Sequence, residues 1–323
     1  MISRRLLRIK AMHIAYAYFN SEGGDIKFFE NELNNSIQKF YDLYLAFFSL
    51  IVEVRDYANH IIELRKGKLL ASEEDLNPNL RFVNNKVIAD LENIEEIKRF
   101  IETNNTIWKE HSNIIKVVYN TLVESDVYED YMKHLVNSYS HDKQIVYYIL
   151  EQIFPDNEDL YQLLEEMSIY WNDDIELVLS MNIRTVQRMK ETKSHNNKLF
   201  PLYKTKDDHE FVKTLFRKTI ANHEHSQQVI AELSESWENE RIALIDRTII
   251  ELAMTELVSF PLMPVPVTLN EYIDMAKFYS TEKSHIFVNG ILEKSVSFLT
   301  EKGLIKKRGT GLLNASPEER DNE

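Results

Sequence analysis

Apolar residues recur every three or four positions along most of this chain, which is the spacing of an amphipathic helix. The first such stretch is 3–20. The next is 26–67, which is dense enough in apolar residues for one or two long buried helices. A polar loop with Pro78 follows, and helical periodicity resumes over much of 86–190. The pattern therefore predicts an all-α protein without a sheet.

A linker is expected at 191–208, because this stretch combines a polar cluster with Pro201. After it the spacing predicts a long helix over 207–237 and another over 238–257. Three prolines lie shortly beyond the second of these helices, so it must end there.

The last two expected helices carry local signals of their own. Thr268 followed by Glu271 fits a capping box, which predicts that a short helix begins at Thr268. The final helix should end at Gly303. Gly290 in its middle costs about 1 kcal/mol relative to alanine, which suggests that something approaches the backbone closely there.

The composition supports the helical prediction and excludes several classes of site. The 323 residues are 44% hydrophobic and include only 7 Gly and 7 Pro, which leaves no room for a glycine-rich phosphate loop. The absence of cysteine excludes disulfides and thiolate metal sites. No segment approaches 18 uncharged apolar residues, and no signal-peptide run follows the N-terminus, so we expect a cytoplasmic protein with no membrane partner.

Positive charge is concentrated at the start of the chain. The formal net charge is −14, yet Arg4, Arg5, Arg8 and Lys10 precede the first acidic residue, Glu22. On a helix the three arginines occupy a sector roughly opposite the apolar one. Lys10 falls within the apolar sector, so its stem should lie along the core edge with the ammonium in water. A local patch of this kind can attract phosphates although the whole protein is acidic.

Residue patterns typical of enzymes are incomplete. Glu282 and His285 have the Glu-x-x-His spacing of di-iron bundles, but a second such pair and two further inward carboxylates are missing. His223 and His225 are two positions apart and point to different sides of a helix, so we expect surface histidines. Because the chain has neither a Gly-x-Ser-x-Gly elbow nor a Walker loop, we expect a non-enzyme without cofactor or metal.

The C-terminal motifs resemble a known family. They are ERIALIDRTIIELAMTEL, the pattern P-x-x-V-x-(I/L)-N-E at 264–271, and SHIFVNGILEK. In order and spacing they closely resemble the C-terminal half of the NusB family of bacterial transcription antitermination factors. The opening SRRLLRIKAMHIAYAYF is similar to the arginine-rich first helix of that family, and DHEFVKTLFRKTI to its third helix. The resemblance covers about 3–20 and 205–303.

The resemblance implies two helical bundles, with a large departure from the short family form. Residues from about 30 to 204 have no counterpart there, and their apolar density indicates a packed helical insertion. We therefore expect an enlarged N-terminal domain over 1–235 (family-like helices 3–20 and 207–235 with the insertion about 30–204), a C-terminal bundle over 236–303, and a basic then acidic flexible tail over 304–323.

The function that the resemblance implies is RNA-binding antitermination. Such a factor binds boxA-type single-stranded RNA together with the ribosomal protein NusE in the transcription elongation complex, and supports processive transcription of ribosomal RNA operons. The alternative is a helical protein-interaction scaffold that has lost RNA binding. The insertion leaves open whether the RNA surface is extended, partly covered, or given an additional partner.

The first helix supplies one set of candidate RNA-binding residues. Arg4, Arg5 and Arg8 would contact phosphates, and Tyr16, at the edge of the same sector, would stack on a splayed base. In the alternative interpretation the arginines solvate a helix end and Tyr16 belongs to the core.

The last helix supplies a second set. Phe287 and Asn289 match family positions associated with RNA contact, and Lys283, where the family usually has an acidic residue, would add positive charge. The alternatives are a core position for Phe287 and ordinary surface positions for the other two.

The resemblance also implies a partner surface. Glu240, Asp246 and Arg247 match the family helix that faces NusE, and charge there suits a polar, electrostatically steered interface. The alternative is a solvated helix face.

Overall fold

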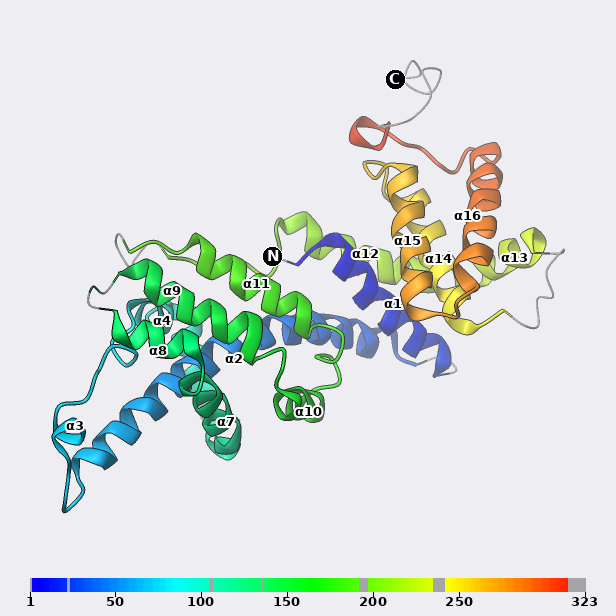
Figure 1. Ribbon diagram of the computed structural model, residues 1–323. Helices are drawn as coiled ribbons and strands as arrows, with labels where there is room; N and C mark the ends of the chain where they lie inside the picture. The colour runs from blue at the N-terminus through cyan, green and yellow to red at the C-terminus, as the bar shows by residue number, and fades with distance from the viewer. Residues whose placement is uncertain are drawn as a thin grey trace. The chain divides into compact units, whose positions relative to one another are not determined.

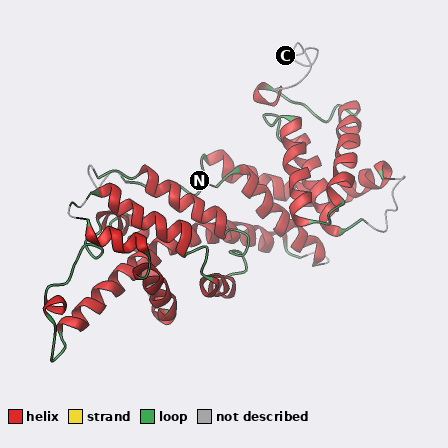
Figure 2. Cartoon of the chain, in the orientation of Figure 1, coloured by secondary structure: helices red, strands yellow, loops and turns green. Residues whose placement is uncertain are grey.

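The computed structural model describes residues 2–21, 24–104, 107–134, 136, 138–191, 197–234 and 242–312. Regular structure in these ranges is helical throughout, and the β-type contact found there is a single parallel bridge between Ile2 and Tyr203 (Figures 1 and 2). The predicted all-α fold is confirmed. Among the described residues no helix is both long and apolar enough to cross a bilayer.

The chain divides into two compact units. The middle unit is Gln38–Leu202, and the split unit combines Ile2–Ile37 with Tyr203–Glu323, in each case within the described residues. The middle unit nearly coincides with the expected insertion, about 30–204. The expected boundary between 235 and 236 falls inside the split unit, and a division into two bundles at that point stays a prediction.

Most of the described part of the middle unit is helix. Its elements are α2 (Ile26–Lys66, from Gln38 on), α3 (Glu73–Leu76), α4 (Lys86–Glu92), α5 (Glu95–Thr103), α6 (Ile107–Glu110), α7 (Ser112–Val123), α8 (Asp126–Lys133), α9 (Tyr139–Tyr148) with a π-helical turn Ile149–Ile153, α10 (Glu158–Met167) and α11 (Ile175–Arg188). Its core contains fully buried aromatic side chains of α2, among them Tyr44, Phe47 and Phe48. The Tyr44 hydroxyl lies 2.6 Å from Thr185 Oγ1, so this buried polar group is satisfied.

The split unit packs helices from both ends of the sequence together. They are α1 (Arg4–Asn20), the start of α2, α12 (Lys206–Ala221), α13 (His223–Leu233), α14 (Leu244–Ser259), α15 (Val265–Tyr279) and α16 (Ser284–Glu301). Helices α14, α15 and α16 contact one another pairwise, and α1 packs against both α12 and α14 (Figure 1). Helix α1 begins at a cap in which Ser3 Oγ accepts a hydrogen bond from Leu6 N.

Three local expectations need correction. The helix expected over 207–237 is two helices, α12 and α13, with Asn222 between them. Helix α15 begins at Val265 rather than Thr268, because proline is accommodated in a first helical turn, where the N–H groups have no intrahelical partner. Gly290 has no neighbour within 4 Å of the position a Cβ would take, so no close approach explains it.

A strap formed by residues 304–312 packs back against the α14–α15 loop. Arg308 N donates to Pro261 O at 3.0 Å, and Thr310 Oγ1 donates to Leu262 O at 2.7 Å. A Cβ on Gly311 would lie 2.0 Å from Pro261 O, so only glycine fits there. The expected flexible tail is therefore a packed segment over 304–312. The rest of it, 313–323, lies outside the described residues.

Candidate nucleic-acid interface

Arg4 and Arg5 are half-exposed at the start of α1. Arg4 Nε lies 2.9 Å from Asp208 Oδ1 at the start of α12, and its guanidinium sits 5.1 Å from the ring centroid of Phe211. Arg5 Nη1 lies 3.4 Å from Asp274 Oδ2 on α15. The Arg5–Asp274 pair is exposed on both sides and contributes little to stability, so a phosphate can compete for Arg5, whereas Arg4 pairs with a carboxylate that is only 7% exposed.

Arg8 does not share this exposure. Its side chain is 3% exposed and makes a two-point ion pair with Glu256 on α14, with Nε–Oε2 and Nη2–Oε1 distances of 2.8 Å. The expectation that Arg8 contacts phosphates is wrong, because its guanidinium is committed inside the split unit. The physical reason is that α1 packs against both α12 and α14, so its buried sector is wider than its apolar stripe.

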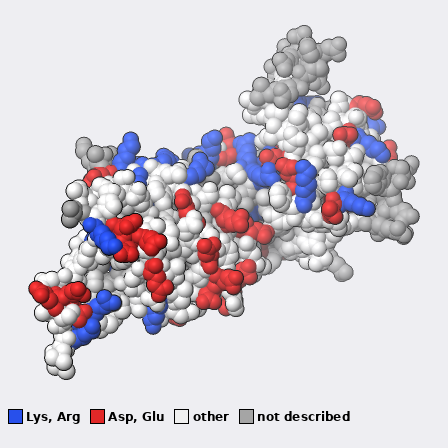
Figure 3. Space-filling model, in the orientation of Figure 1, with Lys and Arg blue, Asp and Glu red and all other residues white. Residues whose placement is uncertain are grey.

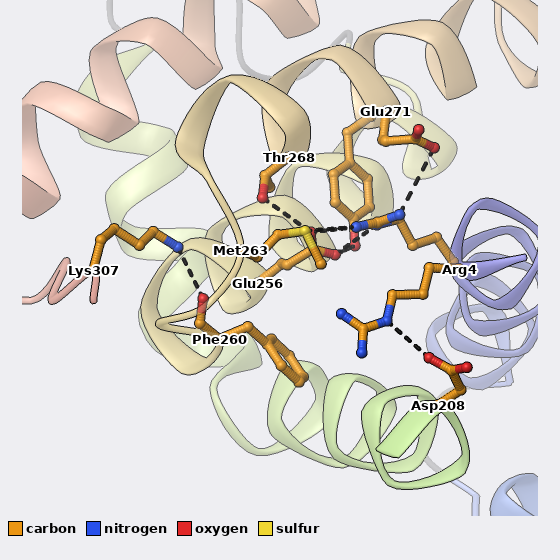
Figure 4. A network of polar contacts seen from close by, with 10 residues as sticks. Arg4, Asp208, Glu256, Phe260, Met263, Thr268, Glu271 and Lys307 are labelled. Carbon is orange, nitrogen blue, oxygen red and sulfur yellow. Dashed lines mark hydrogen bonds and ion pairs between the residues drawn. The ribbon is translucent and has the colours of Figure 1, made fainter. Parts of the chain in front are cut away.

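Glu256 is the centre of a buried polar network (Figure 4). Besides Arg8, its carboxylate accepts hydrogen bonds from Thr268 Oγ1 at 2.9 Å and from the Tyr272 hydroxyl at 3.0 Å. Burial, followed by the neighbouring Glu256 charge, raises the pKa of Tyr272 well above its ordinary value, so this phenol stays a donor. Full satisfaction of the carboxylate makes the network a structural tie between α1, α14 and α15.

Lys10 also differs from expectation. The residue is only 3% exposed. The expectation that its ammonium lies in water is therefore wrong.

Tyr16 remains exposed on α1. It is 38% exposed, so the alternative that places it in the core does not hold. At 100° per residue, Arg5 and Tyr16 lie within about 20° of each other around the helix, and about 16 Å apart along it. Arg5 and Tyr16 are thus exposed toward the two ends of α1, and between them on this side of the helix Met12 is buried and Ile9 is partly exposed.

The three residues expected at the last helix have different environments. Lys283 is exposed and directly precedes α16. Asn289 is partly exposed and donates from Nδ2 to Glu293 Oε1 at 3.1 Å. Phe287 is 9% exposed and belongs to the core of the unit, which supports the packing alternative for this residue.

The expected partner residues are not equivalent either. Asp246 is 5% exposed and accepts a hydrogen bond from Ser284 Oγ at 2.8 Å, so it joins the first turns of α14 and α16 and is not a solvated charge. Arg247 is partly exposed. Glu240 lies outside the described residues.

The histidines do not form a metal site in the part of the chain that is described, where no suitable group of three ligands occurs. His225 is exposed, as expected. His223 is not a plain surface histidine, because its Nδ1 lies 2.9 Å from Glu251 Oε2 and its ring stacks on Phe19.

Sequence reasoning missed two features of this surface. Phe278 on α15 is 75% exposed, and the strap holds Lys306 and Arg308 at exposed positions. Phe278 could have been found from the helical spacing of α15. The buried stripe of that helix includes Tyr272, Met275 and Ala276, and Phe278 projects to the side of it.

Comparisons with known proteins point to one family. A family model described as the NusB family matches residues 175–297. The transcription antitermination protein NusB of Salinibacter ruber is 37% identical over 113 residues, which are 35% of this chain and 71% of that protein. The proteins of the same name from Chloroherpeton thalassium and Natranaerobius thermophilus are 36% and 30% identical, covering 32% and 29% of this chain and 50% and 68% of their own lengths. No solved structure matches.

Proposed function

The chain belongs to the NusB family, and on that premise we propose that it is an RNA-binding transcription antitermination factor. In this proposal it binds boxA-type single-stranded RNA together with NusE in the cytoplasmic transcription elongation complex, and so supports processive transcription of ribosomal RNA operons. The role is one of binding, without a catalytic step or a cofactor.

The observation that carries the proposal is the exposure of cations at the start of α1 and of an aromatic ring toward its end. Arg5 and Tyr16 face the same side of the helix, and Arg4 lies beside them at its start. Cations can hold the phosphates of a single strand while an exposed aromatic ring takes an unstacked base. The proposed RNA-binding surface does not include Arg8, because that residue is buried. Two of the three expected arginines therefore remain in it.

Lys283 gives independent support. It is exposed and lies at the N-cap of α16. The N-terminal end of a helix carries partial positive charge, so a lysine there is unfavourable for the helix itself. Its placement is better suited to an external anion such as an RNA phosphate.

The middle unit favours a second role in protein contact. The stretch 144–183 contains several Asp and Glu residues but no Lys, Arg or His. Acidic side chains gather over α10 and its neighbours (Figure 3), a surface that repels a phosphate backbone. This observation supports the alternative function, a protein-interaction scaffold that has lost RNA binding.

A titration of boxA-type RNA, with and without NusE, tests the proposal. We expect the full chain to bind this RNA, with an affinity that falls as salt rises and increases when NusE is added. A single strand of the same length and shuffled sequence is the control for specificity. Failure to bind RNA in either condition, with the helical fold intact by circular dichroism, would favour the scaffold.

A further inference from the structure

Phe278 is an exposed aromatic residue that the fold does not use. Its side chain projects from α15 away from the buried stripe, and three-quarters of the residue surface is open to water. Neighbouring Tyr279, by contrast, packs edge-on against His13 at 5.1 Å between ring centroids. Packing within the split unit therefore explains Tyr279 but not Phe278.

A cation from another helix lies over the Phe278 ring. The guanidinium carbon of Arg5 is 5.9 Å from the ring centroid, within the range of a cation–π interaction. Asp274, one turn before Phe278 on α15, holds this guanidinium through the 3.4 Å contact to Arg5 Nη1. Asp274 also accepts from Lys277 Nζ at 2.9 Å. The ring is thus exposed, while the cation beside it is held by a neighbour on the same helix.

We propose that Phe278 and Arg5 form a stacking platform for one unpaired base of the bound RNA. The proposal rests on the RNA-binding function proposed above and deepens it. Such a platform contacts the π-face that every base has and does not contact the base edges. It therefore contributes affinity with little sequence preference. Arg5 would contact the phosphate next to the stacked base, and Tyr16, farther along α1, would take another base.

The charges around the ring favour a nucleotide over an apolar protein segment. Arg5 and Lys277 flank Phe278, and both are about half-exposed. An apolar partner covering the ring would have to desolvate these two cations and Asp274, the carboxylate that pairs with both, which is unfavourable. A nucleotide instead places its base on the ring and its phosphate beside the cations.

Substitutions at Phe278 test the platform, with affinity for boxA-type RNA measured over a range of salt concentrations. Phe278→Ala should weaken binding roughly 5- to 150-fold, the equivalent of losing one stacked base, without changing the salt dependence. Phe278→Leu keeps an apolar side chain but no π-face, so it should behave like alanine. Phe278→Trp should retain affinity, and its added fluorescence should be quenched by RNA relative to the wild type.

Phe28→Ala is the matched control, because Phe28 is 56% exposed in the same unit but lies on α2. It should leave RNA affinity unchanged. Thermal unfolding followed by circular dichroism verifies that each variant is folded, and the exposure of Phe278 predicts little loss of stability.

The possible outcomes separate the platform from the function on which it rests. If Phe278→Ala or Phe278→Leu binds RNA as tightly as the wild type, while replacement of Arg4 and Arg5 weakens binding, the platform is wrong and the RNA function stands. If only NusE binding falls in the Phe278 variants, the ring contacts protein and the platform is again wrong. If the wild type binds no RNA, both proposals fail.

Discussion

Arg8 and Glu256 form a buried two-point ion pair although 248 positions separate them in the sequence. The pair connects α1 to α14, and Thr268 and Tyr272 extend the connection to α15. A residue that resembles an RNA-binding arginine in sequence thus stabilises the helices that carry the proposed RNA-binding residues.

Breaking this pair should destabilise the fold. Arg8→Ala leaves the Glu256 carboxylate buried without its cation, which we expect to cost about 3–5 kcal/mol in the free energy of unfolding. Urea unfolding followed by circular dichroism measures the loss. The double variant Arg8→Met with Glu256→Gln, which removes both charges, should be more stable than Arg8→Ala alone. Equal stability of wild type and Arg8→Ala would contradict the assigned role.

Arg4 and Arg5 should act mainly on RNA binding, although replacing Arg4 also leaves the buried Asp208 carboxylate without its cation. Each phosphate that the protein no longer binds should lower the log–log salt slope of RNA affinity by about 0.7, so replacing both arginines with alanine should lower it by about 1.4. Arg99→Ala is the control, because Arg99 is an exposed arginine on α5 that pairs with Glu95 of the same helix. A double variant with wild-type affinity and slope would show that these two arginines merely solvate the start of α1.

Tyr16 should contribute to RNA affinity through stacking, not through charge. If it stacks on a base, Tyr16→Ala should lose roughly 1–3 kcal/mol of RNA affinity while leaving the salt slope nearly unchanged. The same titrations measure both quantities, with Tyr16→Phe as the conservative control that keeps the ring. A reduced slope with unchanged affinity at low salt would argue against stacking.

Substitutions at Asp246 are expected to destabilise the fold, so they do not test binding of a partner protein. Removing the acceptor of the Ser284 hydroxyl by Asp246→Ala should cost roughly 1–3 kcal/mol, and Asp246→Asn, which keeps an oxygen acceptor, should cost less. Thermal melts compare the two variants. The partner surface is better tested at Arg247, where Arg247→Gln should weaken NusE binding, with the melting temperature measured alongside because burial raises the pKa of Glu251 and the Arg247 charge opposes this rise.

Lys307 should make stability depend on pH. Burial lowers its pKa to about 8 from an ordinary value of 10.5, with Glu256 opposing the shift. Between these values the unfolded chain binds more protons than the folded one, so this contribution to stability increases with pH across the window and is lost below it. Urea unfolding should therefore show that the stability of Lys307→Met relative to wild type is higher at pH 7 than at pH 10. Lys306→Met, at the exposed neighbouring position, should show no such change.

Local spacing predicted the helical fold well because helix formation depends on neighbours three and four positions apart. It located α1 and most of the long helices, because the apolar residues of each helix recur every three or four positions within one continuous segment. It misjudged the start of α15, where Thr268 fits a capping box but donates instead to buried Glu256. A capping pattern gives no information about a distant acceptor.

The candidate site was predictable only in part, for the same reason. Arg4, Arg5 and Tyr16 are exposed as the helical sector implied. Arg8 is adjacent to them in that sector, but the partner that buries it lies on α14. Asp246 likewise matches a partner-facing pattern, although Ser284 engages it internally. Whether a charged residue is exposed or buried depends on partners that are distant in the sequence. Local spacing in a single sequence does not identify those partners.

The division of the chain sets an order of events during synthesis. Helix α1 packs against α12, which begins at Lys206, so the nascent chain must grow by almost 200 residues before this contact can form. At about 5–20 residues per second this delay is about 10–40 s. The contiguous segment Gln38–Leu202 emerges completely in that interval, while Leu7 and Met12 of α1 still lack the helices that bury them. The middle of this protein can therefore fold on the ribosome before its two ends meet, and during that time the apolar side of α1 lacks its partner helices.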